Sequence, residues 1–272
     1  EMCIRDSMNT IKSNPIGFFD SGIGGTSIWK EVNKLLPKEN TIYLADSKNA
    51  PYGQKSKEKI LEYCIKNTEF LLNKNAKIIV VACNTATTNA INYLRENYDI
   101  PFIGIEPAIK KAGLVTKNKK IGVLATKGTI NSKLFEKTSN KIDHSIKIIE
   151  QIGYGLVELI ENGEIHSSKM EKHIYSCLDP MLKENIDALV LGCTHYAFLI
   201  PQIKKIVGNR IQIIDSGLAV AKQTKRILTS GDQINSTINK KTFHNFYINR
   251  ESKTLVEILK NHNPIKVIER DF

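Results

Sequence analysis

Short apolar runs rich in β-branched residues alternate with segments of helical periodicity over almost the whole chain. Strands separated by helices are typical of parallel sheets, because a parallel pair needs a crossover connection that a helix supplies. The pattern therefore predicts an α/β protein with mostly parallel strands flanked by helices. We expect strands over residues 16–19, 41–45, 77–82, 101–105, 120–125, 145–149, 187–191, 211–214 and 265–269. Helices are expected over 26–36, 57–72, 169–183 and 252–260.

The chain contains two weak internal echoes. Residues 78–85 and 188–195 both read as an apolar strand, a small residue, a cysteine and then polar residues. Residues 16–22 and 211–217 both end in Asp-Ser-Gly. These echoes predict two related α/β halves with one site between them.

The echoes also indicate where the halves divide. We expect a first domain made of 16–105 plus 217–272 and a second domain made of 106–216. Residues 1–15 precede the first expected strand and are interpreted as a disordered or extraneous leader.

Charge and cysteine usage exclude several classes of function. The net charge is +11, but only six of the 39 basic residues are arginines and the lysines are scattered, which disfavours nucleic acid as a partner. The five cysteines are odd in number and form no C-x-x-C pair, so neither a disulfide framework nor a structural zinc site is expected. No apolar run reaches the roughly 18 residues of a membrane span, and no signal peptide is evident. A cytoplasmic protein follows by default.

A glycine-rich segment, residues 20–25 with the sequence Asp-Ser-Gly-Ile-Gly-Gly, joins the first strand to the first helix. Backbone amides at such a helix start suit an anion, either phosphate or carboxylate. The spacing matches neither a dinucleotide fingerprint nor a P-loop, and a purely structural turn is the alternative.

Cys83 and Cys193 each end an apolar strand and are followed by hydrogen-bonding residues. Ligands of open α/β sheets bind at the carboxyl ends of strands, so each thiol is expected to face a crevice. Two thiols on opposite sides of a ligand suit inversion of a carbon centre, in which one removes a proton and the other returns one. A free cysteine is more often a small buried hydrophobe, and we assign Cys64 and Cys177 to that role. Metal ligation by both strand-end cysteines with His195 is disfavoured by the spacing.

Four ordered motifs carry a resemblance to a known family. They are the segment 20–25, Ala-Asp at 45–46 with Pro-Tyr-Gly at 51–53, Ala-Cys-Asn-Thr-Ala at 82–86, and Gly-Cys-Thr-His-Tyr at 192–196. Together they resemble the motif set of the glutamate racemases. The resemblance implies two pseudo-symmetric α/β domains with the active site between them and no cofactor. It also implies interconversion of L-glutamate and D-glutamate, which supplies D-glutamate for peptidoglycan, in a protein that is often a homodimer.

The resemblance also implies roles for individual residues. Cys83 and Cys193 become the two acid/base residues, with Asp20 beside the first and His195 beside the second. Glu161 aligns with the family's assisting glutamate. The implied substrate-binding residues are Asp20, Ser21, Tyr52, Gly53, Asn84, Thr85, Thr194 and His195.

Three positions depart from the family pattern. Ala197 stands where proline usually follows Thr-His-Tyr, Gly-Tyr at 153–154 replaces a Cys-Pro pair, and threonines at 87–88 replace smaller residues. None of these changes touches the two cysteines, so racemisation is still expected while side-chain specificity is less secure. The alternatives are an aspartate racemase of the same family and a non-catalytic protein that binds an acidic ligand or nucleic acid.

Overall fold

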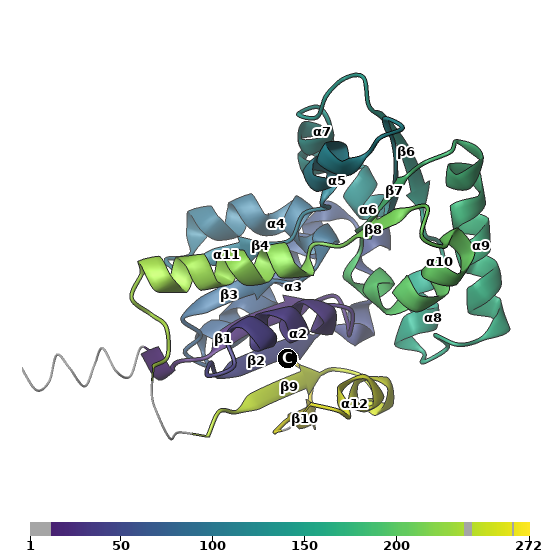
Figure 1. Cartoon of the computed structure of the whole chain (residues 1–272). Coiled ribbons are helices and arrows are strands. Elements are labelled where there is room, and N and C mark those ends of the chain that lie inside the picture. The colour runs from purple at the N-terminus through teal and green to yellow at the C-terminus, as the bar shows by residue number, and fades with distance from the viewer. Residues whose placement is uncertain (1–11, 237–240, 263) are drawn as a thin grey trace, which may run out of the picture.

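The computed structural model describes residues 12–236, 241–262 and 264–272, and it contains two parallel sheets in two lobes (Figure 1). The first sheet has the order β10-β9-β2-β1-β3-β4, and every pair in it is parallel. Its strands are β1 (Ile16–Asp20), β2 (Thr41–Ala45), β3 (Ile78–Val81), β4 (Phe102–Gly104), β9 (His244–Ile248) and β10 (Lys266–Glu269). The prediction of a mostly parallel α/β fold is thus confirmed.

The second sheet has the order β6-β5-β7-β8 and is parallel throughout. Its strands are β5 (Lys120–Ala125), β6 (Lys147–Ile152), β7 (Ala188–Gly192) and β8 (Gln212–Ile214). The expected strands match to within about three residues, but the strand β9 was missed, and it lies between β10 and β2 rather than at an edge.

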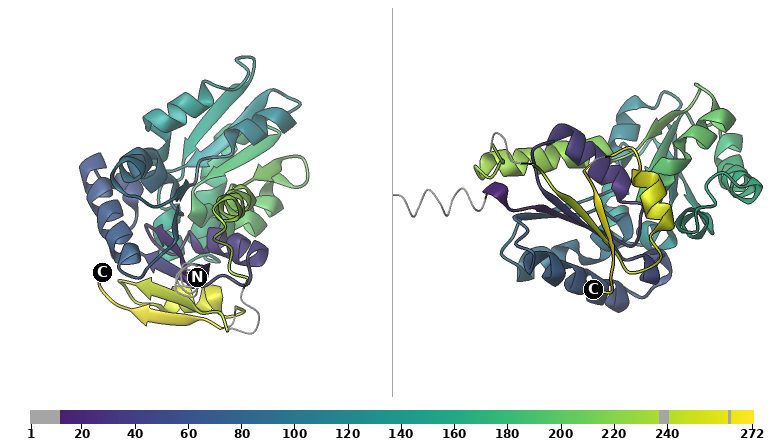
Figure 2. Two further views of the ribbon diagram at one scale, coloured as in Figure 1. Left: turned by 90° about the vertical axis from the view of Figure 1, so that its left-hand side faces the viewer. Right: turned by 90° about the horizontal axis from the view of Figure 1, so that it is seen from below.

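Helices cover both faces of each sheet (Figure 2), which explains why the central strands are apolar without alternation. In the first lobe α2 packs against α11 and α3 packs against α4. The helices of this lobe are α2 (Thr26–Leu35), α3 (Lys57–Leu72), α4 (Asn84–Asn97), α11 (Gly217–Ser230) and α12 (Lys253–Leu259). Those of the second lobe are α5 (Ile109–Val115), α6 (Lys127–Ile130), α7 (Lys133–Ser139), α8 (Leu156–Glu161), α9 (Ser168–Lys183) and α10 (Ile200–Val207). Short 3-10 turns are η1 (Ser47–Asn49), η2 (Tyr52–Gln54) and η3 (Thr194–Leu199).

The strand order of the two sheets shows that one of the two internal echoes relates equivalent strands and that the other does not. The four strands β2-β1-β3-β4 correspond in order and direction to β6-β5-β7-β8. Cys83 follows β3 and Cys193 follows β7, so the cysteine echo joins equivalent strands. The Asp-Ser-Gly echo does not, because β1 lies inside its sheet whereas β8 is an edge strand. Each half does carry an Asp-Ser-Gly sequence at a strand end, but the two strands are not equivalent in their sheets.

The division into two domains remains our proposal, and the two separate sheets support it. The chain passes from the first sheet to the second after β4 and returns after β8 through α11. Of the expected leader, residues 1–11 lie outside the described part of the chain. Residues 12–15 instead contact the first lobe, since Nζ of Lys77 donates to the carbonyl of Lys12 at 2.7 Å and the amide of Lys77 donates to that of Pro15 at 3.0 Å.

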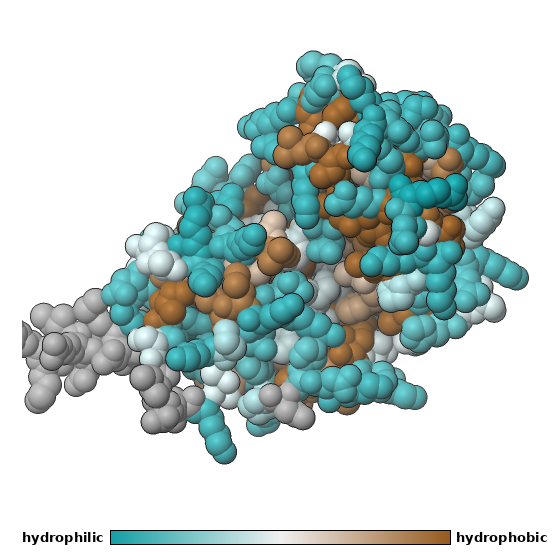
Figure 3. All heavy atoms as spheres, viewed as in Figure 1, coloured by the Kyte–Doolittle hydropathy of each residue, from teal (hydrophilic) through white to brown (hydrophobic). Residues whose placement is uncertain are grey.

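The surface in Figure 3 is largely hydrophilic, and hydrophobic residues gather mainly where β8 and α10 lie. Within the described ranges, no helix combines the length and the apolar character needed to cross a membrane.

Candidate active site

The carboxyl ends of β1, β3 and β7 bring the predicted acid/base residues together between the two sheets. Asp20 is the last residue of β1, Cys83 precedes α4 as its N-cap, and Cys193 directly follows β7. Their exposed fractions are 0%, 5% and 8%, so the thiols are more buried than a strand-end position alone suggested. Burial follows because the second lobe closes over the strand ends of the first.

On the first-sheet side, Cys83 has polar neighbours that can hold or move its proton. The thiol donates to Oγ of Ser21 at 3.7 Å, and its sulfur accepts from the amide of Ala86 at 3.4 Å. Burial raises the pKa of Cys83 well above its ordinary value, and the charge of Asp20 adds to this rise. These two causes outweigh the hydrogen bonds with the Ala86 amide and with Ser21, which act to lower the pKa. The environment therefore favours Cys83 as the neutral thiol.

The Asp20 carboxyl group interacts with Cys83 and also with Thr194, the residue that follows Cys193. Burial raises the pKa of its carboxyl, while the charge of His195, the amide of Gly25 and a hydrogen bond with Cys83 oppose that rise. Its Oδ2 atom accepts from the Gly25 amide at 2.6 Å and from Oγ1 of Thr194 at 3.4 Å. The predicted position of Asp20 beside Cys83 is found.

On the second-sheet side, a chain of contacts runs from Cys193 through His195 to Glu161. The Cys193 sulfur lies 3.8 Å from Nδ1 of His195, and Nε2 of that ring lies 2.6 Å from Oε1 of Glu161. Burial acts to lower the pKa of His195, but its hydrogen bonds and charge interactions with Cys193 and Glu161 outweigh burial and raise the pKa well above its usual range. The arrangement favours a protonated imidazole, which lies between the Cys193 sulfur and the Glu161 carboxyl group.

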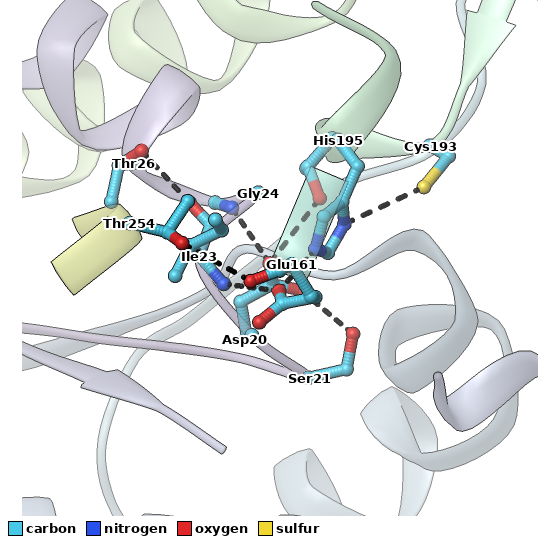
Figure 4. A network of polar contacts seen from close by, with 12 residues as sticks. Asp20, Ser21, Ile23, Gly24, Thr26, Glu161, Cys193, His195 and Thr254 are labelled. Atoms are coloured by element: carbon cyan, nitrogen blue, oxygen red, sulfur yellow. Dashed lines mark hydrogen bonds and ion pairs between the residues drawn. The ribbon is translucent and has the colours of Figure 1, made fainter. Parts of the chain in front are cut away.

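The glycine-rich segment binds carboxylates of the chain itself. The amide of Gly25 donates to the carboxylate of Asp20, and the amide of Ile23 donates to Oε1 of Glu161 at 2.8 Å (Figure 4). The expected anion is therefore internal, and these two amides are already occupied. None of these glycines has a positive φ. Their role is close approach, because a Cβ on Gly24 would lie 2.3 Å from Nδ1 of His195.

The predicted substrate-binding residues form two groups. Asn84, Thr85, Thr194 and Ser21 lie at the strand ends beside the two cysteines. Both side-chain polar atoms of Asn84 are buried and find no hydrogen-bond partner in the described part of the chain, which leaves a donor and an acceptor for a ligand. Asn84, Thr194 and Cys193 line a cavity of about 370 Å³ that also reaches Ala197.

Tyr52 and Gly53 form the second group and have structural contacts. The Tyr52 hydroxyl donates to Oδ2 of Asp46 at 2.5 Å and accepts from Asn67 at 3.2 Å. Gly53 faces the second lobe, where a Cβ would lie 2.8 Å from Cβ of Thr126.

Two threonines of the second lobe, Thr126 and Thr129, lie next to Thr85. Oγ1 of Thr85 lies 2.8 Å from Oγ1 of Thr126 and 3.2 Å from Oγ1 of Thr129, so three hydroxyls from both lobes meet. Thr126 directly follows β5, the strand equivalent to β1. The strand-end rule that identified the cysteines would have identified it as well. Among the described residues, no group of three or more His, Cys, Asp and Glu side chains could hold a metal ion.

Comparison with known proteins places the chain among racemases. The model of the Asp/Glu/hydantoin racemase family matches residues 20–224. The glutamate racemase of Ralstonia pickettii is 44% identical over 223 residues, which cover 82% of this chain and 79% of that protein. The crystal structure of a Bacillus anthracis glutamate racemase isoform has a TM-score of 0.85 at 34% identity, covering 96% of this chain and 98% of that one. The Francisella tularensis glutamate racemase, solved in complex with D-glutamate, has a TM-score of 0.81 at 30% identity, with coverage of 96% and 98%.

Proposed function

The chain belongs to the Asp/Glu/hydantoin racemase family and is an amino-acid racemase, and on that premise we propose that it interconverts L-glutamate and D-glutamate without a cofactor. The observation that carries the proposal is the placement of Cys83 and Cys193 at equivalent strand ends with different partners. A non-catalytic binding protein, the alternative left open by the sequence, does not agree with this membership.

The different partners support a defined starting state. Cys193 begins as a thiolate paired with protonated His195, and Cys83 begins as a neutral thiol beside Asp20. A base and an acid are then available at once on opposite sides of a bound amino acid. This division of roles by environment lets two chemically identical side chains perform opposite tasks.

The reaction moves one proton to each side of the substrate. The Cys193 thiolate takes the α-proton, and the electron pair of the broken C–H bond remains on the α-carbon and its carboxylate. The S–H bond of Cys83 then breaks and delivers its proton to the opposite face of the carbon. The product is the other enantiomer, with Cys193 as thiol and Cys83 as thiolate, so reaction of that enantiomer starts from the reversed state.

Charge on the substrate must be stabilised by fixed donors, since the transition state resembles a carbanion. The proposal assigns the amino-acid end of the substrate to the amide of Asn84 and the hydroxyl of Thr194, which line a cavity together with Cys193. The hydroxyls of Thr85, Thr126 and Thr129 offer donors for a second carboxylate. Two separate groups of donors suit an amino acid with a carboxylate at each end.

The test is exchange of the substrate's α-proton with solvent deuterium by purified protein dialysed free of small molecules. NMR should show loss of the α-proton signal of L-glutamate. Circular dichroism should show the ellipticity of the glutamate solution decaying towards zero. Faster exchange of aspartate than of glutamate would identify the chain as an aspartate racemase instead. A requirement for added pyridoxal phosphate or metal would overturn the cofactor-independent mechanism.

Supply of D-glutamate for peptidoglycan and assembly as a homodimer also belong to the proposal. Dependence of a gene-deleted bacterium on added D-glutamate tests the first, and sedimentation of the purified protein tests the second.

A further inference from the structure

The C-terminal segment of the first lobe contacts the helix that carries Glu161. Oγ1 of Thr254, in the first turn of α12, donates to the backbone carbonyl of Glu161 at 3.3 Å (Figure 4). Beside it, a guanidinium nitrogen of Arg250 donates to Oδ1 of Asn162 at 2.8 Å. Both contacts therefore join the end of α8 in the second lobe to residues that follow β9 in the first.

The carbonyl of Glu161 is free to accept this bond because of where α8 ends. The last four carbonyls of a helix have no partner within it. Here the amides of Asn162, Gly163 and Glu164 bond to the carbonyls of residues 158, 160 and 159 respectively. Glu161 receives the hydroxyl of Thr254, which fixes the backbone from which its side chain extends.

The Glu161 carboxylate has little room to adjust if its backbone moves. The Glu161 side chain is 3% exposed, and its Oε1 atom contacts both the Ile23 amide and Nε2 of His195. A Cβ on Gly22 would lie 1.9 Å from that oxygen, so the glycine-rich segment packs directly on it. A shift of a few tenths of an ångström at the end of α8 would lengthen the contact with His195.

We propose that Thr254 is a positioning residue that holds Glu161 against His195 from the opposite lobe. The inference rests on the proposed racemase function for its kinetic consequence. Through Glu161, the C-terminal segment helps keep His195 protonated and thereby Cys193 ready as the base. The contact between the two lobes and the arrangement of the acid/base pair are then coupled.

The kinetic test is Thr254→Val, which keeps the shape of the side chain and removes its hydroxyl. We expect kcat to fall about fivefold, the effect of one lost hydrogen bond, with KM for glutamate unchanged. The titratable groups that face His195 are Cys193, Glu161 and Asp20. Weaker contact with Glu161 lowers the pKa of His195, so the alkaline limb of the pH profile should move to lower pH.

Two further variants separate positioning from general damage. Thr254→Ser keeps the hydroxyl and should restore the wild-type kcat and pH profile. Thr229→Val removes a hydroxyl bond of the same kind, to the carbonyl of Lys225 in α11, and should change neither. Equal effects of Thr254→Val and Thr254→Ser would overturn the proposal. So would a change in KM with kcat unchanged.

A measurement without substrate keeps this inference distinct from the proposed function. NMR titration of the His195 ring in ligand-free protein should give a lower pKa for Thr254→Val than for wild type. If Thr254→Val fails to fold, the exposed variant Arg250→Met serves in its place and should lower the pKa in the same direction. An unchanged His195 pKa rejects the inference even if the enzyme racemises glutamate. A protein that does not racemise glutamate rejects the proposed function and leaves the NMR result to decide the inference.

Discussion

Nε2 of His195 lies 2.6 Å from Oε1 of Glu161, and the two side chains are 1% and 3% exposed. This pair joins the strand end that carries Cys193 to the end of α8, and the Ile23 amide adds a contact from the first lobe. A buried ion pair of this kind is costly unless its remaining hydrogen-bonding groups are satisfied. Here the imidazole has Cys193 on its other nitrogen, so both ring nitrogens have partners.

Glu161→Gln should narrow the pH range of activity. The carboxylate helps to hold the pKa of His195 above its usual value, so removal of the charge lowers that pKa. Protonated His195 is present only below its pKa, and the alkaline limb should therefore move to lower pH. At neutral pH we expect kcat to fall by about 10-fold to 100-fold. The measurement is the pH profile of kcat by circular dichroism of glutamate.

Glu158→Gln is the matched control, because Glu158 lies in the same helix and bonds to the exposed Gln54 rather than to His195. Its pH profile should equal that of wild type. An alkaline limb of Glu161→Gln that stays in place would contradict the assigned role of Glu161.

Cys83→Ser and Cys193→Ser should each lower racemisation by about a thousandfold or more, because a hydroxyl is a far weaker acid than a thiol. Folding should remain intact, since the exchange of sulfur for oxygen is small. Cys177→Ser changes a buried helical cysteine outside the site and should keep its activity. Retention of most turnover by either strand-end variant would mean that the two-base mechanism is wrong.

Gly24→Ala tests the close approach of the glycine-rich segment to the imidazole. The new Cβ would lie 2.3 Å from Nδ1 of His195, so the ring or the loop must move. We expect a loss of about 1–3 kcal/mol in the free energy of unfolding together with a large fall in kcat. Gly231→Ala is the control, since its nearest neighbour would be 3.5 Å away. A Gly24→Ala protein with wild-type stability and activity would show that this contact has no role.

Asn84→Ala should weaken substrate binding without weakening the fold. Neither polar atom of the amide has a hydrogen-bond partner among the residues that the structure describes, so its removal breaks none of their hydrogen bonds. We expect KM for glutamate to rise about tenfold, with a thermal midpoint equal to or above that of wild type. Asn97→Ala, at the exposed end of the same helix, should leave KM unchanged. A fall in stability with no change in KM would assign Asn84 to the fold instead.

Short-range patterns in the sequence predict the strands and the residues at their ends, because both depend on neighbouring residues along the chain. Buried parallel strands require continuous apolar runs. Such runs in the sequence predict β1, β3, β5 and β7. Cys83 and Cys193 follow from the same rule, because polar residues at strand ends stand out against those runs. The strand β9, with the sequence His-Asn-Phe-Tyr-Ile, was missed because its polar start hides the pattern.

Tertiary structure alone decided which strand ends face each other and what the glycine-rich amides bind. Ile23 and Glu161 are 138 residues apart, and Thr254 lies 93 residues from Glu161. Such contacts join two different sheets that pack on one another, and no short-range periodicity encodes the geometry of that packing. The sequence by itself determined two thiols at strand ends. Their unequal environments, one favouring the neutral thiol and the other pairing sulfur with an imidazole, come from the packing of the two lobes.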